Sequence, residues 1–155
     1  MSTEAATDPD ARRFLDASLF VRVDDPAAPW RLVASRCGTC GAVTFPAQTS
    51  CPRCTGEDVS AHALADRGTV WASTVQRFSP KTPYLGADGS LPPFGVGYVD
   101  LAGEVIVETR LVGDPADLGI GAPVSLRLEA LPGRDGEPVW TFAFAPTEPH
   151  RLDAP

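Results

Sequence analysis

The stretch CGTCGAVTFPAQTSCPRC, residues 37–54, contains every cysteine of this 155-residue chain. The thiols stand at Cys37, Cys40, Cys51 and Cys54, with the spacing C-x2-C-x10-C-x2-C. Two residues between paired cysteines let both thiolates aim at one point. Two such pairs form a closed tetrahedral site, and sulfur-only ligation favours zinc. Because four cysteines leave no coordination position for water or substrate, the sequence predicts a structural zinc ion and not a catalytic one.

Two other states of these cysteines are compatible with the spacing. Disulfides are one, but residues 1–10 are polar and acidic, with no basic start or apolar stretch. We therefore expect no signal peptide and a reducing, cytoplasmic location, in which disulfides are uncommon. The second is iron in the same cage, as in rubredoxin-like electron carriers. A rubrerythrin-type centre would also need a carboxylate-rich helical bundle, which the sequence does not indicate.

Composition limits the partners of the chain. Its apolar content is 43%, and no apolar run approaches the roughly 20 residues that a membrane span needs. Its net charge is -7, and its 13 basic residues are spread along the sequence. Such a chain repels phosphate backbones unless its basic residues cluster on one face. Membrane insertion and nucleic-acid binding are therefore disfavoured.

The first part of the chain is expected to hold a short helix and a small ribbon. Asp8-Pro9 resembles an N-cap followed by proline at the first helical position, which predicts a helix from Pro9 to about Phe20. This helix would pack on its own domain or on a partner. The ribbon would consist of strands over residues 30–36, 42–46 and 58–65 around the cysteines. A ribbon of this size has almost no core, so metal is expected to hold it together.

The second part reads as mainly β structure. Five strands are expected over residues 69–78, 95–101, 104–112, 124–130 and 139–144, with hairpin turns at residues 102–103 and 132–136. In the first of these strands, strict alternation puts Val70 and Ala72 on one side and Trp71 and Ser73 on the other. Five short antiparallel strands favour a small, partly open barrel of the OB type. An SH3-like barrel or a small sandwich stays open, since residues 114–121 leave room for one helical turn.

These elements predict four segments. They are an N-terminal tail and helical arm over 1–29, a zinc ribbon over 30–66, an OB-fold barrel over 67–146 and a C-terminal tail over 147–155.

The order of these elements resembles a known family. It is the zinc-ribbon and OB-fold acyl-CoA-associated family, formerly a domain of unknown function. The matching stretches are residues 36–41, Phe45-Pro46 before residues 51–54, residues 68–75, Pro92-Pro93-Phe94 and residues 142–146. One departure is Thr55, where the family usually has glycine, and Gly56 is expected to supply that turn instead.

The resemblance implies an accessory subunit. Members of the family assemble with thiolase-fold proteins, including thiolases, lipid-transfer-protein-like aldolases acting on steroid side chains, and partners of hydroxymethylglutaryl-CoA synthase. The implied role is to complete or stabilise an acyl-CoA site at the shared interface of a hetero-oligomer, sometimes together with a hydratase.

Catalysis on this chain is not expected. A thiolase needs a free cysteine nucleophile with histidines nearby, and every cysteine here is assigned to metal. The two histidines, His62 and His150, read as ordinary surface residues. The sequence contains no nucleophile elbow, phosphate loop or dinucleotide fingerprint. The predicted set of catalytic residues is therefore empty.

The segment from Arg77 to Phe94 is the expected contact region. Long loops are often functional, and this one combines aromatic and basic side chains with four prolines. The candidate contacts with a partner or with acyl-CoA are Arg77, Phe78, Lys81, Tyr84 and Phe94, of which Arg77 or Lys81 would approach the CoA phosphates. The plainer interpretation is a stiff surface loop in which Phe78 and Phe94 cap the core.

Two further functions are compatible with the sequence. Zinc ribbons and OB-folds also bind single-stranded nucleic acid, and Trp71, Phe78, Tyr84 and Tyr98 are available to stack on bases. The acidic balance argues against it. Iron in the cysteine cage would instead give an electron carrier.

Overall fold

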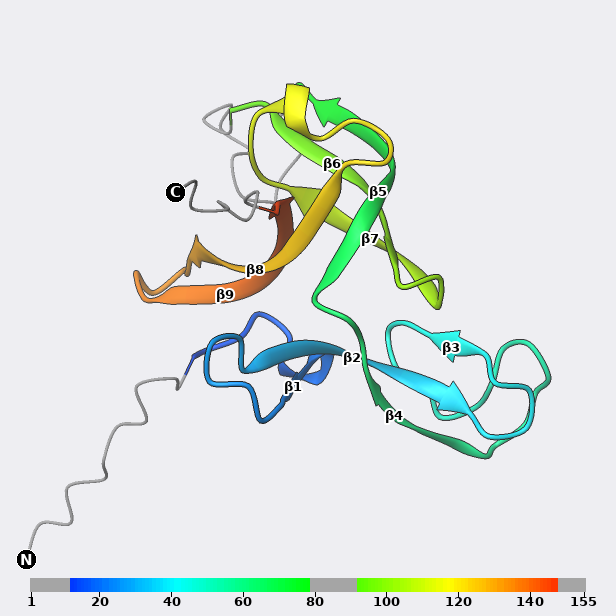
Figure 1. Cartoon of the computed structure of the whole chain (residues 1–155). Helices are drawn as coiled ribbons and strands as arrows, with labels where there is room; N and C mark the ends of the chain where they lie inside the picture. The colour runs from blue at the N-terminus through cyan, green and yellow to red at the C-terminus, as the bar shows by residue number, and fades with distance from the viewer. Residues whose placement is uncertain (1–11, 79–91, 148–155) are drawn as a thin grey trace, which may run out of the picture.

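The computed structural model describes residues 12–78 and 92–147 and contains a small four-stranded sheet followed by a closed five-stranded barrel (Figure 1). The sheet consists of β1 (Phe20–Arg22), β2 (Trp30–Cys37), β3 (Val43–Thr44) and β4 (Val59–Ala63). The barrel consists of β5 (Arg67–Gln76), β6 (Phe94–Leu101), β7 (Val105–Leu111), β8 (Pro123–Pro132) and β9 (Pro138–Pro146). Two short 3-10 helices, η1 (Ala17–Leu19) and η2 (Pro115–Asp117), complete the described elements. The predicted mainly β fold is confirmed.

The barrel closes in the order β5-β6-β7-β9-β8. All of its strand pairs are antiparallel except β7 and β9, which meet in parallel at Leu111 and Phe144. Alternate residues of β6 and β7 point inward, so Val99 and Val107 face each other in the core with at most 1% of their surface exposed. The sequence predicted a partly open barrel, and the short β7–β9 contact is what closes it.

Strand β2 connects the two halves of the molecule. Its first residues pair with β1, and its last residues pair with β3 and β4 on opposite edges. Leu32 and Ala34 on β2, with Leu64 just after β4, are buried in the same hydrophobic cluster as Phe144 of the barrel. The expectation that the ribbon has almost no core is therefore wrong for its inner half, because that half shares the core of the barrel. The expected limits of the ribbon at 30–66 and of the barrel at 67–146 remain predictions.

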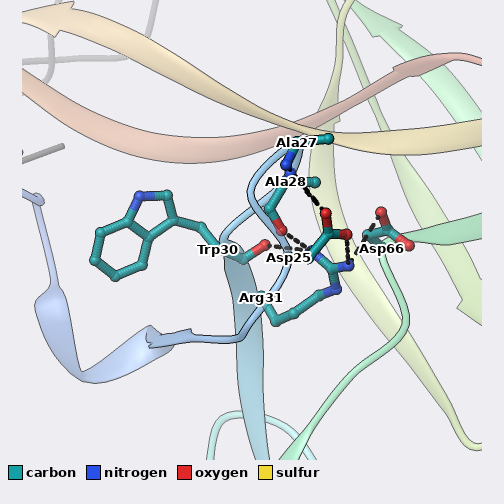
Figure 2. A network of polar contacts seen from close by, with 6 residues as sticks. All are labelled: Asp25, Ala27, Ala28, Trp30, Arg31 and Asp66. Carbon is teal, nitrogen blue, oxygen red and sulfur yellow. Dashed lines mark hydrogen bonds and ion pairs between the residues drawn. The ribbon is translucent and has the colours of Figure 1, made fainter.

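An ionic network at the junction fixes the loop before β2 to the link between β4 and β5 (Figure 2). The guanidinium of Arg31 lies 3.2 Å from the Asp25 carboxylate and 3.5 Å from that of Asp66. It also donates to the carbonyls of Ala28 and Trp30, at 2.5 and 3.0 Å. Only 14% of the Arg31 side chain is exposed, so this cation depends on its protein partners and not on water.

The N-terminal arm is a strand-like extension in its described part, and the predicted helix is wrong there. Phe14 forms a parallel bridge with Trp140 on β9, and the Leu15 amide donates to the Trp140 carbonyl at 2.8 Å. Phe14 also stacks on Phe20, with ring centroids 4.2 Å apart. A helix this short is marginal on its own, whereas the edge of β9 offers unpaired backbone groups. Of the helix, only the turn η1 remains, and no helix of the described chain is long and apolar enough to cross a membrane.

Candidate metal centre

Two chain reversals of the same kind present the four cysteines. The first knuckle, residues 37–41, begins at the last residue of β2, and the second knuckle comprises residues 51–55. In the first, the Gly41 amide donates to the Cys37 carbonyl at 3.0 Å; in the second, the Thr55 amide donates to the Cys51 carbonyl at 2.8 Å. Each knuckle thus brings its two sulfurs to the same side of one turn.

The sulfur positions fit a tetrahedral metal ion. The Sγ atoms of Cys37 and Cys54 lie 3.6 Å apart, as do those of Cys40 and Cys51, and all four lie within 4.8 Å of one another. Zinc–sulfur bonds of about 2.3 Å in a tetrahedron separate neighbouring sulfurs by about 3.8 Å. A disulfide would bring two sulfurs to about 2.05 Å, and all four thiols are free. Among the described residues, these four cysteines are the group whose ligand atoms lie close enough together to hold a metal ion.

The charge of the four cysteine thiolates favours the binding of a cation. The pKa of Cys37 is lowered to about 6, chiefly by the hydrogen bond from the Cys40 backbone amide, and that of Cys51 is lowered chiefly by the Cys54 amide. The pKa of Cys54 moves the other way, to about 12. The Gly56 amide lowers it, but the neighbouring sulfurs of Cys37, Cys40 and Cys51 and burial together raise it by more. Four thiolates this close do not ionise together unaided, and a divalent ion supplies the missing positive charge.

Each knuckle needs a left-handed residue directly after its second cysteine. In the first knuckle this residue is Gly41, with φ of 74°. In the second it is Thr55 itself, with φ of 61°. The expectation that Gly56 supplies this turn is therefore wrong. Gly56 serves close packing instead, because a Cβ there would lie 3.3 Å from the Cys54 sulfur.

The described ends of the expected contact segment adjoin the barrel strands β5 and β6 and not the knuckles. Arg77 and Phe78 are exposed just beyond the end of β5, and Phe78 has 73% of its surface accessible. Phe94 is half-buried at the start of β6, where the Arg110 guanidinium covers its ring at 5.1 Å. Lys81 and Tyr84 lie outside the described residues, so their roles remain predictions.

A polar cluster that the sequence did not reveal ties the ribbon to the barrel. His62 on β4 lies with Nε2 3.0 Å from Nη2 of Arg36 on β2 and 3.0 Å from Oε2 of Glu104 in the β6–β7 turn. Arg36 also pairs with Glu104 directly. The pKa of Glu104 is lowered, first by the hydrogen bond with His62 and then by Arg36. His62 is thus a structural contact between the two parts and not the ordinary surface residue expected. His150 lies outside the described residues.

Known protein families match both halves of the chain. Residues 25–60 match the model of the ChsH2 rubredoxin-like zinc ribbon domain, and residues 61–129 match that of the ChsH2 C-terminal OB-fold domain. The chain is 30% identical over 132 residues to the benzoylsuccinyl-CoA thiolase subunit BbsA of Thauera aromatica, covering 84% of this chain and 86% of BbsA. The chain belongs to the ChsH2 (DUF35) family. The resemblance noted from the sequence is thereby confirmed.

Two other relatives extend this family assignment. A DUF35 domain-containing scaffold protein of Methanocaldococcus jannaschii is 26% identical over 121 residues, covering 76% of this chain and 82% of the relative. A chain of the solved Ltp2-ChsH2(DUF35) aldolase is 29% identical and superposes with a TM-score of 0.56, covering 75% of this chain and 84% of that chain. The family's zinc ribbon corresponds to the four-cysteine cluster, and its donor set fits a structural zinc ion.

Proposed function

We propose that this ChsH2-family chain is a non-catalytic accessory subunit of a thiolase-fold enzyme, such as a thiolase or a lipid-transfer-protein-like aldolase. The observation that carries this proposal is its identity of 30% to a named thiolase subunit over 86% of that subunit. Its similarity to a chain of the Ltp2-ChsH2(DUF35) aldolase supports the same role.

The chemistry of the chain agrees with an accessory role. Thiolase chemistry needs a cysteine thiolate and a nearby base. All four cysteines of this chain meet in one cluster, where a zinc ion would occupy every thiolate. His62, the histidine that the structure describes, is held by Arg36 and Glu104. The nucleophile, the base and the acyl-CoA site would therefore belong to the partner. This chain would stabilise that partner in the cytoplasm. In some assemblies a hydratase would be a further subunit.

The role of the zinc ion would be to make the outer end of the small sheet rigid. The four cysteines would hold it, fixing the outer end of the β2–β3–β4 sheet relative to the barrel. The barrel and the inner half of the sheet are already joined by a common core and by the Arg31 network. A partner would therefore meet one preformed surface and lose little conformational entropy on binding.

Co-purification tests the proposal. The tagged full-length chain is purified from its source organism, and the thiolase-fold protein that accompanies it is identified by mass spectrometry. The two are then co-expressed, and the complex is measured by size-exclusion chromatography with light scattering. We expect a stable complex with a fixed ratio of subunits. Two separate peaks at micromolar concentration, with every thiolase-fold protein of the organism tried, would rule the proposal out.

A further inference from the structure

One outer face of the barrel carries large apolar side chains that are exposed to solvent, at positions where polar side chains are usual. Trp71, Tyr98 and Ile106 lie on the adjacent strands β5, β6 and β7, and they have 58%, 42% and 44% of their surfaces exposed. The rings of Trp71 and Tyr98 meet edge to face, with centroids 6.1 Å apart. We call these three residues, with Phe94 and Val96 of the same side of β6, the outer aromatic face.

A bulge in β5 lies within this face. Val70 pairs with Val99 and Ala72 pairs with Tyr98, so Trp71 is an extra residue between two successive pairs. A bulge of this kind re-aims a side chain without disturbing the core. Val70 and Val99 stay buried beneath it, with at most 1% exposed. Trp71 therefore contributes little to the barrel interior. Packing within the described chain does not account for its exposed indole ring.

An apolar groove continues the face along β6. Its volume is about 400 Å³, and it is lined by Phe94 and Val96, which lie on the same side of β6 as Tyr98. Leu131 of β8 and Leu15 of the N-terminal arm also line it, and Leu15 is 64% exposed. The basic group in the groove, Arg110, is paired with Glu129 at 3.3 Å. Its charge is therefore balanced within the chain.

The charged residues opposite Tyr98 and Ile106 are acidic. In the β6–β7 register, Tyr98 stands opposite Glu108, and Ile106 stands opposite Asp100. A partner with an apolar patch bordered by lysine or arginine complements this pattern. A second copy of the chain would bring the same carboxylates and a net charge of -7 to the contact. An oligonucleotide would be repelled for the same reason.

We propose that the outer aromatic face is the surface through which this chain docks on its thiolase-fold partner. The inference rests on the function proposed above and adds the site to it. Trp71 and Tyr98 have the character of interface hot spots, large amphipathic side chains at the centre of a contact, while Glu108 and Asp100 form its polar rim. Of the expected contact residues that the structure describes, Arg77, Phe78 and Phe94, we count only Phe94 in this face.

The test uses the full chain and the thiolase-fold protein that co-purifies with it. Dissociation constants are measured for the wild type and for Trp71→Ala, Tyr98→Ala and Glu108→Lys. The matched control is Phe78→Ala, since Phe78 is 73% exposed but lies beyond the end of β5, outside the face. We expect Trp71→Ala and Tyr98→Ala each to weaken binding by about tenfold or more, as hot-spot residues do. Glu108→Lys is expected to slow association most at low salt, and the control is expected to bind as wild type.

Hydroxyl-radical footprinting of the unmutated complex provides a second measurement that does not depend on any variant folding. Trp71 and Tyr98 are expected to become at least several-fold less reactive in the complex, while Phe78 keeps its reactivity. If the wild type binds but neither the affinities nor the footprint change at this face, the docking site is wrong and the accessory function stands. If the wild type binds no thiolase-fold protein, both proposals fail. Self-association through Trp71, or salt-sensitive binding of a single-stranded oligothymidine, would also overturn the site.

Discussion

The cysteine end of the small sheet and the barrel next to it are stabilised by different forces. Around the two knuckles, the buried apolar atoms belong mainly to Cys37 and Cys51, and the turns hold together by a few backbone hydrogen bonds. In the barrel, side chains such as Phe144, Leu101 and Val124 are wholly buried. Strand β2 takes part in both regions, because it ends at Cys37 and its residues Leu32 and Ala34 lie in the core that includes Phe144. A metal-dependent end can thus be added to a burial-dependent core without a separate domain interface.

Removal of zinc should have the largest effect, and it should separate the two regions. Structural zinc contributes on the order of 10–16 kcal/mol in small metal-folded domains. With a chelator or in Cys51→Ser, the Gly41 and Thr55 amides should exchange hydrogen rapidly, while the amides of β6 and β7 stay protected. Hydrogen exchange with mass spectrometry measures both regions at once. Equal loss of protection in the barrel would contradict the division.

A substitution in the shared core should do the opposite and destabilise both regions together. Leu32 lies on β2 but has 1% of its surface exposed within the cluster that includes Phe144. Leu32→Ala should therefore cost about 2–5 kcal/mol in the free energy of unfolding, measured with bound zinc in urea. The matched control is Leu15→Ala, at 64% exposure, which should change the value by less than about 0.5 kcal/mol. Unfolding of the ribbon alone in Leu32→Ala would show that the core is not shared.

The Arg31 network should contribute less than the core. Arg31→Met removes the partner of Asp25 and Asp66 at the junction, and we expect a loss of about 1–3 kcal/mol in the free energy of unfolding. A double-mutant cycle with Asp66→Asn should give a coupling energy of at least about 0.5 kcal/mol. Strict additivity of the two substitutions would mean that the pair does not fix the junction.

The two knuckles provide a smaller comparison at one equivalent position. Gly41→Ala should destabilise by about 1 kcal/mol, because alanine is strained at a φ of 74°. Thr55→Gly should instead stabilise by about 0.5–1 kcal/mol, since strain relief of about 1–2 kcal/mol exceeds the added flexibility of the unfolded chain. Thermal unfolding of the zinc-loaded variants measures both. A destabilised Thr55→Gly would show that the left-handed threonine carries no strain.

The smallest effect should be seen at an exposed ion pair. The pKa of Asp135 is lowered to about 2, first by the hydrogen bond from Arg13 and then by the Glu137 amide. A depressed carboxyl pKa stabilises the fold above its unfolded value near 4 and loses that contribution as the pH falls toward 2. In Arg13→Gln, an NMR titration should move the Asp135 pKa upward, toward 4. An unchanged value would mean that Arg13 does not hold the N-terminal arm here.

The sequence was informative where the determining residues are close together. The cysteine spacing predicted the metal cluster, and the strand-like runs 95–101 and 104–112 with a turn at residues 102–103 predicted the β6–β7 hairpin. The N-terminal strand was not predictable, because Phe14 pairs with Trp140, more than a hundred residues away. Long-range pairs such as His62 with Glu104 were missed for the same reason. The predicted alternation placed Trp71 on the opposite side from Val70, as observed. The bulge was not predictable, and it pairs Ala72 with the outward Tyr98 and not on the inner side with Val70.

A reconstitution assay tests the central claim, that this chain supports catalysis on another protein, most directly. Acyl-CoA cleavage is measured for the thiolase-fold partner alone, for this chain alone and for the two together. This chain is loaded with zinc in every sample that contains it. The account predicts no turnover by this chain alone and a higher rate or a more stable activity for the pair than for the partner alone. Thioester turnover by this chain without its partner would contradict the account, as would a partner whose rate and lifetime are unchanged when the chain is added.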